Sequence, residues 1–338
     1  MIAQSKQTAF IKDIYEADNI TLITHVNPDG DALGASLALF HFLQKQNKNV
    51  RVIVPNHVPE FLQWMPGFDQ IIIFEFQQEE AKQYVKNSDL IVLLDFSALN
   101  RIEPLDDLIR EINIKSILID HHPFFESFPD MTISNAKVSS TAELIYELLA
   151  PIDKNALDTD IAISIYTGIM TDTVDFRYNV RQRTFQILAD LLNYNIDIEA
   201  IHSNVYDKFS ENRMNLLGYC LHQKLIVLPK YKTAYITITK DELKQFSFMP
   251  GDSEGFVNYP LSIKNITFSA LFIEEEQFIK ISFRSKGDFA VNKFADRYFN
   301  GGGHKNAAGG LSYNSLNETI EKFTSLLPYY ETNMNFIN

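Results

Sequence analysis

The chain has 338 residues, 46% of them hydrophobic and 22% charged, which is typical of folded globular proteins and unlike disordered or collagen-like chains. This length favours two domains over one. The net charge of −13, from 30 basic and 43 acidic residues, argues against a protein that coats long duplex nucleic acid by neutralising its phosphates. This net charge is compatible with a small anionic substrate that is bound at a local site.

Two further observations concern location and metal chemistry. The first ten residues lack the apolar stretch of a signal peptide, and no apolar run approaches the ~20 residues of a membrane helix. We therefore expect a cytoplasmic protein with no membrane partner. The single cysteine, Cys220, excludes an intrachain disulfide and a thiolate-rich metal site, so any metal must be held by histidine and carboxylate.

The first half of the chain alternates short apolar, β-branched runs with amphipathic stretches. This pattern is typical of the strands and crossover helices of a mostly parallel sheet. The predicted strands are 20–24, 50–54, 70–74, 90–95 and 116–120, and the predicted helices are 31–46, 81–86, 141–149 and 159–170.

The second half begins with polar helical segments and continues with a second set of strands. Helices are predicted at 183–194, 198–206, 291–299 and 315–327, and strands at 225–228, 234–239, 266–272 and 278–283. We therefore predict an α/β fold in three parts. A domain with a mostly parallel sheet flanked by helices spans residues 1–190, a helical connector spans 191–215, and a smaller α/β domain spans 216–338.

The first chemical motif is the sequence HVNPDGD at residues 25–31, between a predicted strand and a predicted helix. Ligands bind in loops at the carboxyl ends of strands in open α/β sheets. One imidazole and two carboxylates, on a turn bent by Pro28 and Gly30, can converge on a divalent cation. The alternative is purely structural: Asp31 caps the helix and Asp29 fills a turn.

Three more acidic or histidine positions follow apolar segments. Asp95 ends the run LIVLL, and a carboxylate there alone is more often a cap or turn former than a ligand. Asp120-His121-His122-Pro123 closes another apolar strand, where a cluster of ionisable groups is costly unless it is paired or bound to metal. Asp172 ends an apolar helical stretch, where the helix dipole disfavours a negative charge and a cation would compensate it.

The last motif is GGGHKNAAGG at residues 301–310, which contains five of the 13 glycines. Glycines let backbone N–H groups approach a phosphate closely, and His304 and Lys305 add charge. Arg284 lies upstream in SFRSKG, and an arginine suits bidentate contact with phosphate. Five basic and two acidic residues fall between Arg284 and Lys305, so positive charge is concentrated in this region. A tight glycine turn would account for two glycines, not for five.

Taken in order, HVNPDGD, Asp95, DHHP, Asp172 and GGGHKNAAGG resemble the motifs of the DHH phosphoesterase superfamily with a C-terminal DHHA1 domain. The resemblance spans residues 20–326. The two-domain length and SFRSKG are most similar to the nano-RNA hydrolases of that superfamily, which also act as 3′,5′-bisphosphate nucleotidases. The resemblance implies a hydrolase of short oligoribonucleotides or nucleoside 3′,5′-bisphosphates.

It also implies two divalent cations, usually Mn²⁺, with Mg²⁺ or Co²⁺ as alternatives. The implied ligands are His25 and Asp29 for one ion, Asp31, His121 and Asp172 for the other, and Asp95 as the bridge. Asp95, His121 and His122 form the implied catalytic group. The implied substrate contacts are His122, Arg284, Gly301, Gly302, Gly303 and His304. The family commonly has Asp-Thr-Gly at the fourth motif, whereas Val174 and Asp175 follow Asp172-Thr173 here.

The main alternative is a phosphodiesterase of cyclic or linear dinucleotides. The absence of a membrane segment or sensor domain disfavours the cyclic substrate, whereas linear dinucleotides stay compatible with the sequence. An inorganic pyrophosphatase fits the GGGH segment less well. A long-strand exonuclease would need more nucleic-acid-binding surface. A non-catalytic nucleotide-binding module should lack a metal ligand, and all six are present. A homodimer is left open.

Overall fold

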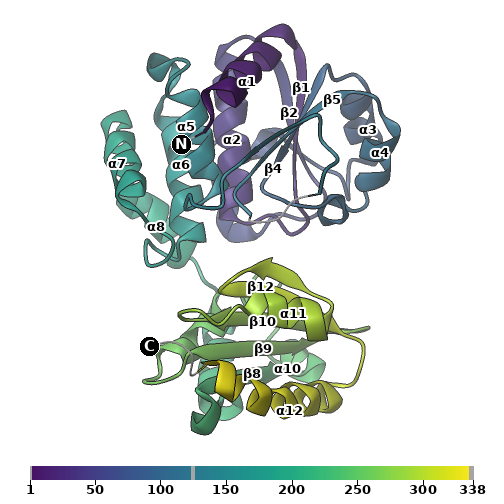
Figure 1. Ribbon diagram of the computed structural model, residues 1–338, viewed down its shortest axis with the longest axis vertical. Helices are drawn as coiled ribbons and strands as arrows, with labels where there is room; N and C mark the ends of the chain where they lie inside the picture. Colours follow the sequence, from purple (N-terminus) through teal and green to yellow (C-terminus); the bar gives the residue numbers. More distant parts are fainter. Residues whose placement is uncertain (1, 123–125, 335–338) are drawn as a thin grey trace. The chain divides into compact units, whose positions relative to one another are not determined.

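The computed structural model describes residues 2–122 and 126–334, except for the side chains of residues 304 and 331–334. The chain forms two compact units, Met1–Lys208 and Phe209–Asn338 (Figure 1). The division falls inside the segment 191–215, where we predict a helical connector. No helix in the described part of the chain is long and apolar enough to span a membrane.

The first unit is built on a six-stranded sheet in which all the pairings are parallel, in the order β3-β2-β1-β4-β5-β6. Its strands are rich in β-branched residues and are buried on both faces, as parallel strands covered by helices require. The strands are β1 (Asn19–Thr24), β2 (Asn49–Val54), β3 (Ile71–Ile73), β4 (Leu90–Leu94), β5 (Lys115–Asp120) and β6 (Met131–Ser134).

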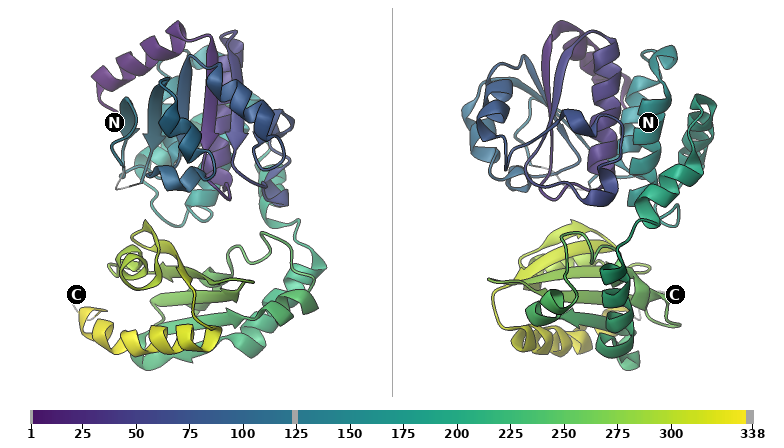
Figure 2. Two further views of the ribbon diagram at one scale, coloured as in Figure 1. Left: turned by 90° about the vertical axis from the view of Figure 1, so that its right-hand side faces the viewer. Right: turned by 180° about the vertical axis from the view of Figure 1, so that it is seen from behind.

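Helices cover both faces of this sheet, as the ribbon views show (Figures 1 and 2). The larger apolar core lies under α1, α2, α5 and α6, and a smaller one lies under α3 and α4. The helices of this unit are α1 (Gln4–Glu16), α2 (Gly30–Lys45), α3 (Gln78–Lys86), α4 (Asp106–Glu111), α5 (Thr141–Leu149), α6 (Thr159–Asp172), α7 (Gln182–Leu191) and α8 (Ile198–Tyr206).

The register of the sheet determines which side chains meet at its carboxyl edge. Thr24 of β1 pairs with Leu94 of β4, and Leu94 pairs with Ile119 of β5. The next residue along β1 is His25, along β4 it is Asp95, and along β5 it is Asp120. These three residues therefore lie in one row at the carboxyl edge of the sheet.

Two glycines let helices α2, α5 and α6 pack closely beside this edge. A Cβ atom on Gly34 would lie 2.5 Å from the carbonyl oxygen of Ser164, and one on Gly168 would lie 2.6 Å from the Cβ of Ala142. Both distances are below van der Waals contact. This close packing brings the start of α2 and the end of α6, which carry Asp31 and Asp172, to the same end of the unit.

The second unit has a six-stranded sheet in the order β11-β12-β10-β9-β8-β7, antiparallel except for the parallel pair β8 and β9. An aromatic core that includes Phe268, Phe283 and Phe323 packs against one face. The elements are α9 (Glu211–Tyr219), β7 (Ile226–Leu228), β8 (Thr233–Ile238), α10 (Lys240–Gln245), β9 (Phe268–Glu274), β10 (Ile279–Ser285), α11 (Val291–Phe299), β11 (Gly302–His304), β12 (Ala307–Ser312) and α12 (Leu316–Met334).

The predicted α/β class and the parallel sheet are confirmed, while several elements are missing from the prediction. Helix α1 and strand β6 lie in segments with no prediction, because their apolar residues are few or irregularly spaced. The glycine-rich segment 301–310 is not an open loop. It forms the hairpin of β11 and β12, in which Gly302 pairs with Gly309.

Candidate metal centre

The predicted metal-site residues of the first unit gather at the carboxyl edge of its sheet. His25 follows β1, Asp95 follows β4, and His121 follows β5. Asp29 caps α2, accepting hydrogen bonds from the backbone N–H groups of Asp31 and Ala32 at 3.0 Å each. The structural alternative, in which Asp31 caps this helix, therefore names the wrong residue, because Asp29 is the cap.

Two groups of side chains, joined by one carboxylate, make up the site. His25, Asp29 and Asp95 place one ligand atom each within 4.8 Å of one another, and so do Asp31, His121 and Asp172. Asp95 belongs to the first group and forms a third such group with His121 and His122, so it connects the first group to His121 of the second. Ligands of one divalent ion lie ~2.0–2.2 Å from it and hence ~3–4 Å from each other, so both groups fit an ion.

The distances show how Asp95 connects the groups. Its Oδ2 atom lies 3.6 Å from Nε2 of His25, and its Oδ1 atom lies 3.7 Å from Nε2 of His121. Nε2 of His121 also lies 3.7 Å from Oδ2 of Asp31 and 3.7 Å from Oδ2 of Asp172. The two oxygens of Asp95 thus face different groups.

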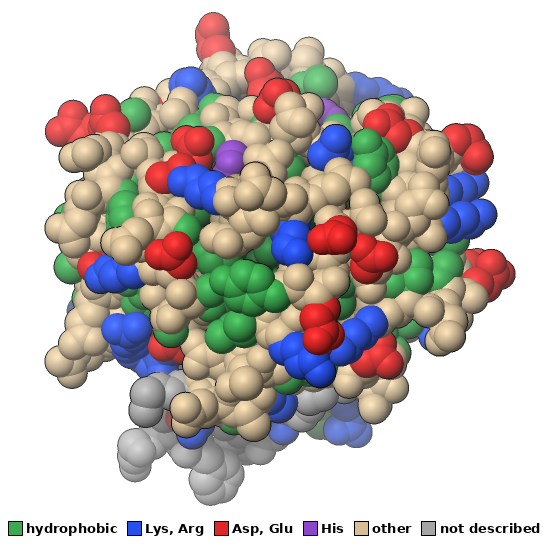
Figure 3. Space-filling model, turned by 90° about the horizontal axis from the view of Figure 1, so that it is seen from above, with side chains coloured by type: hydrophobic (Ala, Val, Ile, Leu, Met, Phe, Trp, Pro, Cys, Tyr) green, Lys and Arg blue, Asp and Glu red, His purple; other side chains and the backbone are tan. Residues whose placement is uncertain are grey.

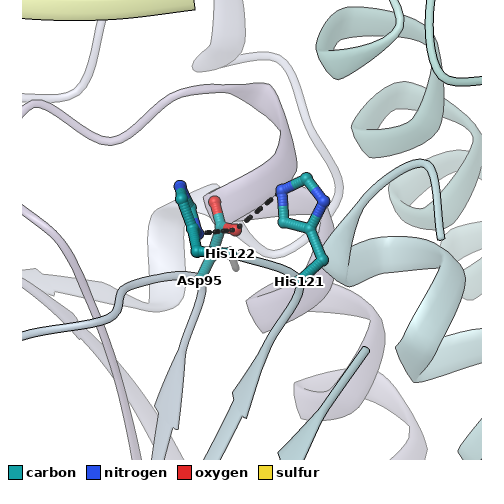
Figure 4. Close-up of side chains that lie close together, drawn as sticks. All are labelled: Asp95, His121 and His122. Carbon is teal, nitrogen blue, oxygen red and sulfur yellow. Dashed lines mark ion pairs between the residues drawn. The ribbon is translucent and has the colours of Figure 1, made fainter. Parts of the chain in front are cut away.

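His122 lies beside this arrangement. Figure 4 shows Asp95 between the rings of His121 and His122, with ion pairs to both. Nδ1 of His122 is 3.9 Å from Oδ1 of Asp95 and donates a hydrogen bond of 2.6 Å to Oδ1 of Asp120. This bond fixes the plane of the imidazole at the edge of the site.

Burial makes the site electrostatically costly without a cation. Asp31 and Asp95 are only 1% and 3% exposed. Burial raises the pKa of Asp31 well above its usual range, and the charges of Asp95 and Asp172 act in the same direction. Burial also raises the pKa of Asp172, to about 6, although the charge of His121 opposes the change. Asp31 and Asp172 therefore lack sufficient positive charge around them, and divalent cations would supply it.

The histidines carry part of the compensation. Burial favours the neutral acid of Asp95, but contact with His25 and the charges of His122 and His121 bring its pKa below the usual value. Burial also lowers the pKa of His25, yet Asp95 and the charge of Asp29 raise it overall. The donor set therefore mixes imidazole and carboxylate, as borderline and hard divalent ions prefer.

The backbone is strained at two places in the site. Asp95 has φ = 65°, in the left-handed region, which is uncommon for non-glycine residues and in which such residues cluster at active sites. After α6, Val174, Asp175 and Phe176 have φ of 51°, 58° and 61°. A β-branched residue at positive φ is a genuine outlier, which gives a physical reason for glycine in the family pattern at the position of Val174.

Two contributions to the site are absent from the predicted set. Thr141, the first residue of α5, donates hydrogen bonds to both Asp31 and Asp95. Arg101 follows β4 in a short 3₁₀ helix, and its positive charge lowers the pKa of His25. The sequence gives no signal for either, since a threonine at a helix start and an exposed arginine are common.

The predicted substrate residues lie in the second unit, apart from His122. Arg284 lies on β10 and pairs with Ala307 of β12, and its guanidinium donates to the carbonyl oxygen of Phe283 at 3.0 Å. The backbone of His304 ends β11, whereas its side chain lies outside the described residues. Lys305 pairs with Asp288 at 2.6 Å, which offsets part of the local positive charge.

The glycines of the hairpin fall into two groups. A Cβ atom on Gly303 would lie 2.6 Å from the carbonyl oxygen of Ala307, and one on Gly310 would lie 2.8 Å from that of Phe299. Gly301 likewise faces Gly309 too closely for a side chain. By contrast, a Cβ atom on Gly302 would have no atom within 4 Å. Steric need therefore explains Gly301, Gly303 and Gly310 but not Gly302 or Gly309, where a Cβ atom would lie 3.8 Å from the carbonyl oxygen of Ile281.

Comparisons with known proteins agree with this architecture. Residues 19–169 match the DHH family, N-terminal domain, and residues 230–329 match the DHHA1 domain. The bifunctional oligoribonuclease and PAP phosphatase NrnA of Bacillus subtilis (strain 168) is 29% identical over 312 residues, covering 91% of this chain and 93% of that protein. The cyclic-di-AMP phosphodiesterase GdpP of the same organism is 27% identical over 94% of this chain, which spans 48% of GdpP.

One solved structure is similar to this chain over almost its whole length. The crystal structure of an exopolyphosphatase-related protein from Bacteroides fragilis superposes with a TM-score of 0.95 at 43% identity, and the match covers 99% of both chains. The family models, the relatives and the shared fold lead to one conclusion. The chain belongs to the DHH family of phosphoesterases, hydrolases of phosphoester bonds, and carries a DHHA1 domain in its second half.

Proposed function

We propose that the protein hydrolyses short oligoribonucleotides, such as dinucleotides, and nucleoside 3′,5′-bisphosphates, using two divalent cations. The observation that carries the proposal is the pair of ligand groups joined by Asp95. The likeness to NrnA of Bacillus subtilis, named an oligoribonuclease and PAP phosphatase, supports the choice of substrates.

The proposed ligands are those of the two groups. His25, Asp29 and Asp95 would hold one ion. The second ion would be held by Asp31, His121 and Asp172, with Asp95 shared between the two ions. Mn²⁺ suits this mixture of imidazole and carboxylate, with Mg²⁺ or Co²⁺ as alternatives. When bound, a pair of such ions activates a water near neutral pH and offsets the negative charge that develops on the phosphoryl group.

The remaining proposed site residues would contact different parts of the substrate. His122, held by Asp120, would face the scissile phosphate and stabilise its negative charge through the imidazole. In the second unit, Arg284, Gly301, Gly302, Gly303 and His304 would bind the other phosphates or the nucleoside. The open space beside Gly302 supports close approach of its backbone to a phosphate.

The charge distribution favours short substrates. The protein carries a net charge of −13, and the basic residues of the proposed binding segment are few. On the face of the molecule in Figure 3, Lys and Arg side chains are interspersed with Asp and Glu side chains. Only a few phosphates can therefore be neutralised at once, so affinity should not keep rising with the length of the RNA. Its salt dependence should be shallow for the same reason.

A substrate panel tests the proposal directly. The purified protein with Mn²⁺ is incubated with a diribonucleotide, a five-nucleotide RNA, a twenty-nucleotide RNA, a nucleoside 3′,5′-bisphosphate and pyrophosphate. We expect the dinucleotide and the bisphosphate to be hydrolysed fastest, and a chelator to stop both reactions. Faster degradation of the twenty-nucleotide RNA, or a preference for pyrophosphate, would contradict the proposal.

A cyclic-dinucleotide phosphodiesterase is the second candidate, and the match to GdpP over 94% of this chain favours it. The same panel separates the two candidates when cyclic di-AMP and its linear product are added. The proposed oligoribonuclease activity predicts that the linear dinucleotide is hydrolysed much faster than the cyclic one. The reverse order would favour the second candidate.

A further inference from the structure

We infer that Thr141 is a positioning residue that holds Asp95 and Asp31 in the orientation needed to bind two cations. The inference rests on the proposed two-ion centre. Oγ1 of Thr141 donates a hydrogen bond of 2.7 Å to Oδ1 of Asp95. The backbone N–H of Thr141 donates to Oδ2 of Asp31 at 2.6 Å. Thr141 therefore contacts Asp95 of the first ligand group and Asp31 of the second.

The hydroxyl of Thr141 determines how the Asp95 carboxylate is rotated. Because Oδ1 accepts this bond, it stays on the side of His121, and Oδ2 is directed toward Nε2 of His25, 3.6 Å away. A carboxylate that joins two ions must present one oxygen to each. A carboxylate oxygen has two lone pairs, so Oδ1 can accept the Thr141 bond and still contact an ion.

The start of α5 holds Asp31 in a similar way. Oδ2 of Asp31 accepts a hydrogen bond from the N–H of Thr141, and Oδ1 of Asp31 accepts one from the N–H of Ala142 at 2.8 Å. The amide groups at a helix start carry partial positive charge, which stabilises an anion there. Both oxygens of Asp31, a residue that is only 1% exposed, are thereby oriented.

Ordinary helix capping does not account for the Thr141 hydroxyl. Ser140 is the N-cap of α5, and its side chain accepts the N–H of Glu143 at 3.0 Å. The hydroxyl of Thr141 instead reaches Asp95, 46 residues earlier in the chain. Thr141 is itself fully buried, so water cannot replace Asp95 as the partner of its hydroxyl, and loss of this hydrogen bond would cost free energy.

A buried network fixes the position of this helix start. Oε2 of Glu143 accepts from the backbone N–H of Ser139 at 3.1 Å and from the hydroxyls of Ser139 and Thr184 at 2.5 and 2.8 Å. Oε1 accepts from the guanidinium of Arg181 at 2.7 Å. Glu143 has no exposure to solvent. The donor atoms of Thr141 are therefore held in place independently of any ion.

The experiment compares the affinity of full-length variants for Mn²⁺ alone, measured by calorimetry after treatment with a chelator. Thr141→Val keeps the shape of the side chain and removes the hydroxyl, whereas Thr141→Ser keeps the hydroxyl. Thr167→Val is the matched control, because Thr167 is also fully buried in a helix of this unit and its hydroxyl has no hydrogen-bond partner among the described residues.

We expect Thr141→Val to bind Mn²⁺ ~10- to 100-fold more weakly, as is typical when a group that orients a ligand is removed, and Thr141→Ser to stay close to wild type. Thr167→Val should bind as the wild type does. Wild-type affinity in Thr141→Val overturns the positioning role while the two-ion proposal stands. A wild-type protein that binds fewer than two Mn²⁺ ions overturns both. If Thr141→Val does not fold, Thr141→Ala takes its place under the same criteria.

Discussion

Asp120 accepts a hydrogen bond of 2.6 Å from Nδ1 of His122, and the carboxylate has no exposure to solvent. Its other oxygen, Oδ2, has no hydrogen-bond partner within the described ranges of the chain. Burial alone would lower the pKa of His122, but the hydrogen bond to Asp120 and the surrounding carboxylates raise it to about 9. His122 is therefore a cation at neutral pH in the metal-free protein.

This pair predicts a pH dependence of stability. The folded-state pKa of about 9 lies above the ordinary value of 6.5, so the charged imidazole stabilises the fold fully below pH 6.5 and loses that effect as the pH rises through 9. The expected loss is of the order of 2–3 kcal/mol. Urea unfolding of chelator-treated protein between pH 6.5 and 9.5 measures it.

The variant Asp120→Asn isolates the contribution of this pair. It should flatten the pH slope between pH 6.5 and 9.5, whatever its own stability is. The raised pKa of Asp172 makes stability change with pH mainly between 3.8 and about 6, below this range, so it adds little to the slope measured here. Equal slopes for wild type and Asp120→Asn would contradict the assignment.

Asp95 is expected to be indispensable for catalysis. Asp95→Ala should lower the rate of dinucleotide hydrolysis by ~10²-fold or more, since the loss removes the only carboxylate shared by both proposed ion sites. The rate is measured at saturating Mn²⁺, with circular dichroism as the check on folding. Asp107→Ala, an exposed carboxylate in the first turn of α4, is the control. Retention of more than about a tenth of the wild-type rate would argue against the role of Asp95.

Arg284 should affect the substrate and not the metal. Arg284→Ala removes one charge-assisted contact to phosphate, worth ~1.5–3 kcal/mol, or roughly 10- to 150-fold in kcat/KM for nucleotides. Mn²⁺ affinity should stay unchanged, because the proposed ligands all lie in the first unit. Lys280→Ala is the matched control, because Lys280 is an exposed cation on the same strand β10 and lies outside the basic segment 284–305.

A second substrate shows where Arg284 acts. Hydrolysis of bis-(p-nitrophenyl) phosphate should fall much less, because this small diester needs few contacts beyond the reacting phosphoryl group. Equal losses on both substrates would place Arg284 at that group and would reject the proposed division of labour between the two units.

Val174 predicts a stabilising substitution. A left-handed conformation costs an L-residue about 1–2 kcal/mol, whereas glycine adopts it freely and loses about 0.5–1 kcal/mol of chain entropy on folding. Val174→Gly should therefore raise the free energy of unfolding by about 0.5 kcal/mol. The half-buried Val180, which is not among the positive-φ residues, is the control, and Val180→Gly should be destabilising. A loss of stability in Val174→Gly equal to that in Val180→Gly would show that strain is not the dominant effect.

The sequence predicts the grouping of the candidate site residues at one edge because parallel strands carry them. Once the runs before His25, Asp95 and Asp120 are taken as strands of one parallel sheet, their carboxyl ends must lie together, and the register confirms this. The helix ends that carry Asp31 and Asp172 are also near their predicted bounds.

Other features depend on tertiary contacts that no local pattern contains. Thr141 acquires its role only because α5 begins beside Asp95, and a hydroxyl at a helix start ordinarily acts as a cap. The hairpin of β11 and β12 is hidden by its glycines, which are uncommon in strands and are present because neighbouring backbones approach closely. The left-handed turn at Val174 contradicts the conformational preference of valine itself.

The most direct test of the two-ion centre is anomalous diffraction from a crystal of the protein soaked in Mn²⁺. We predict two peaks in the first unit, ~3.5–4 Å apart, with a carboxylate oxygen of Asp95 facing each. One peak should contact His25 and Asp29, and the other should contact Asp31, His121 and Asp172. A single peak, or two peaks that do not share Asp95, would contradict the account.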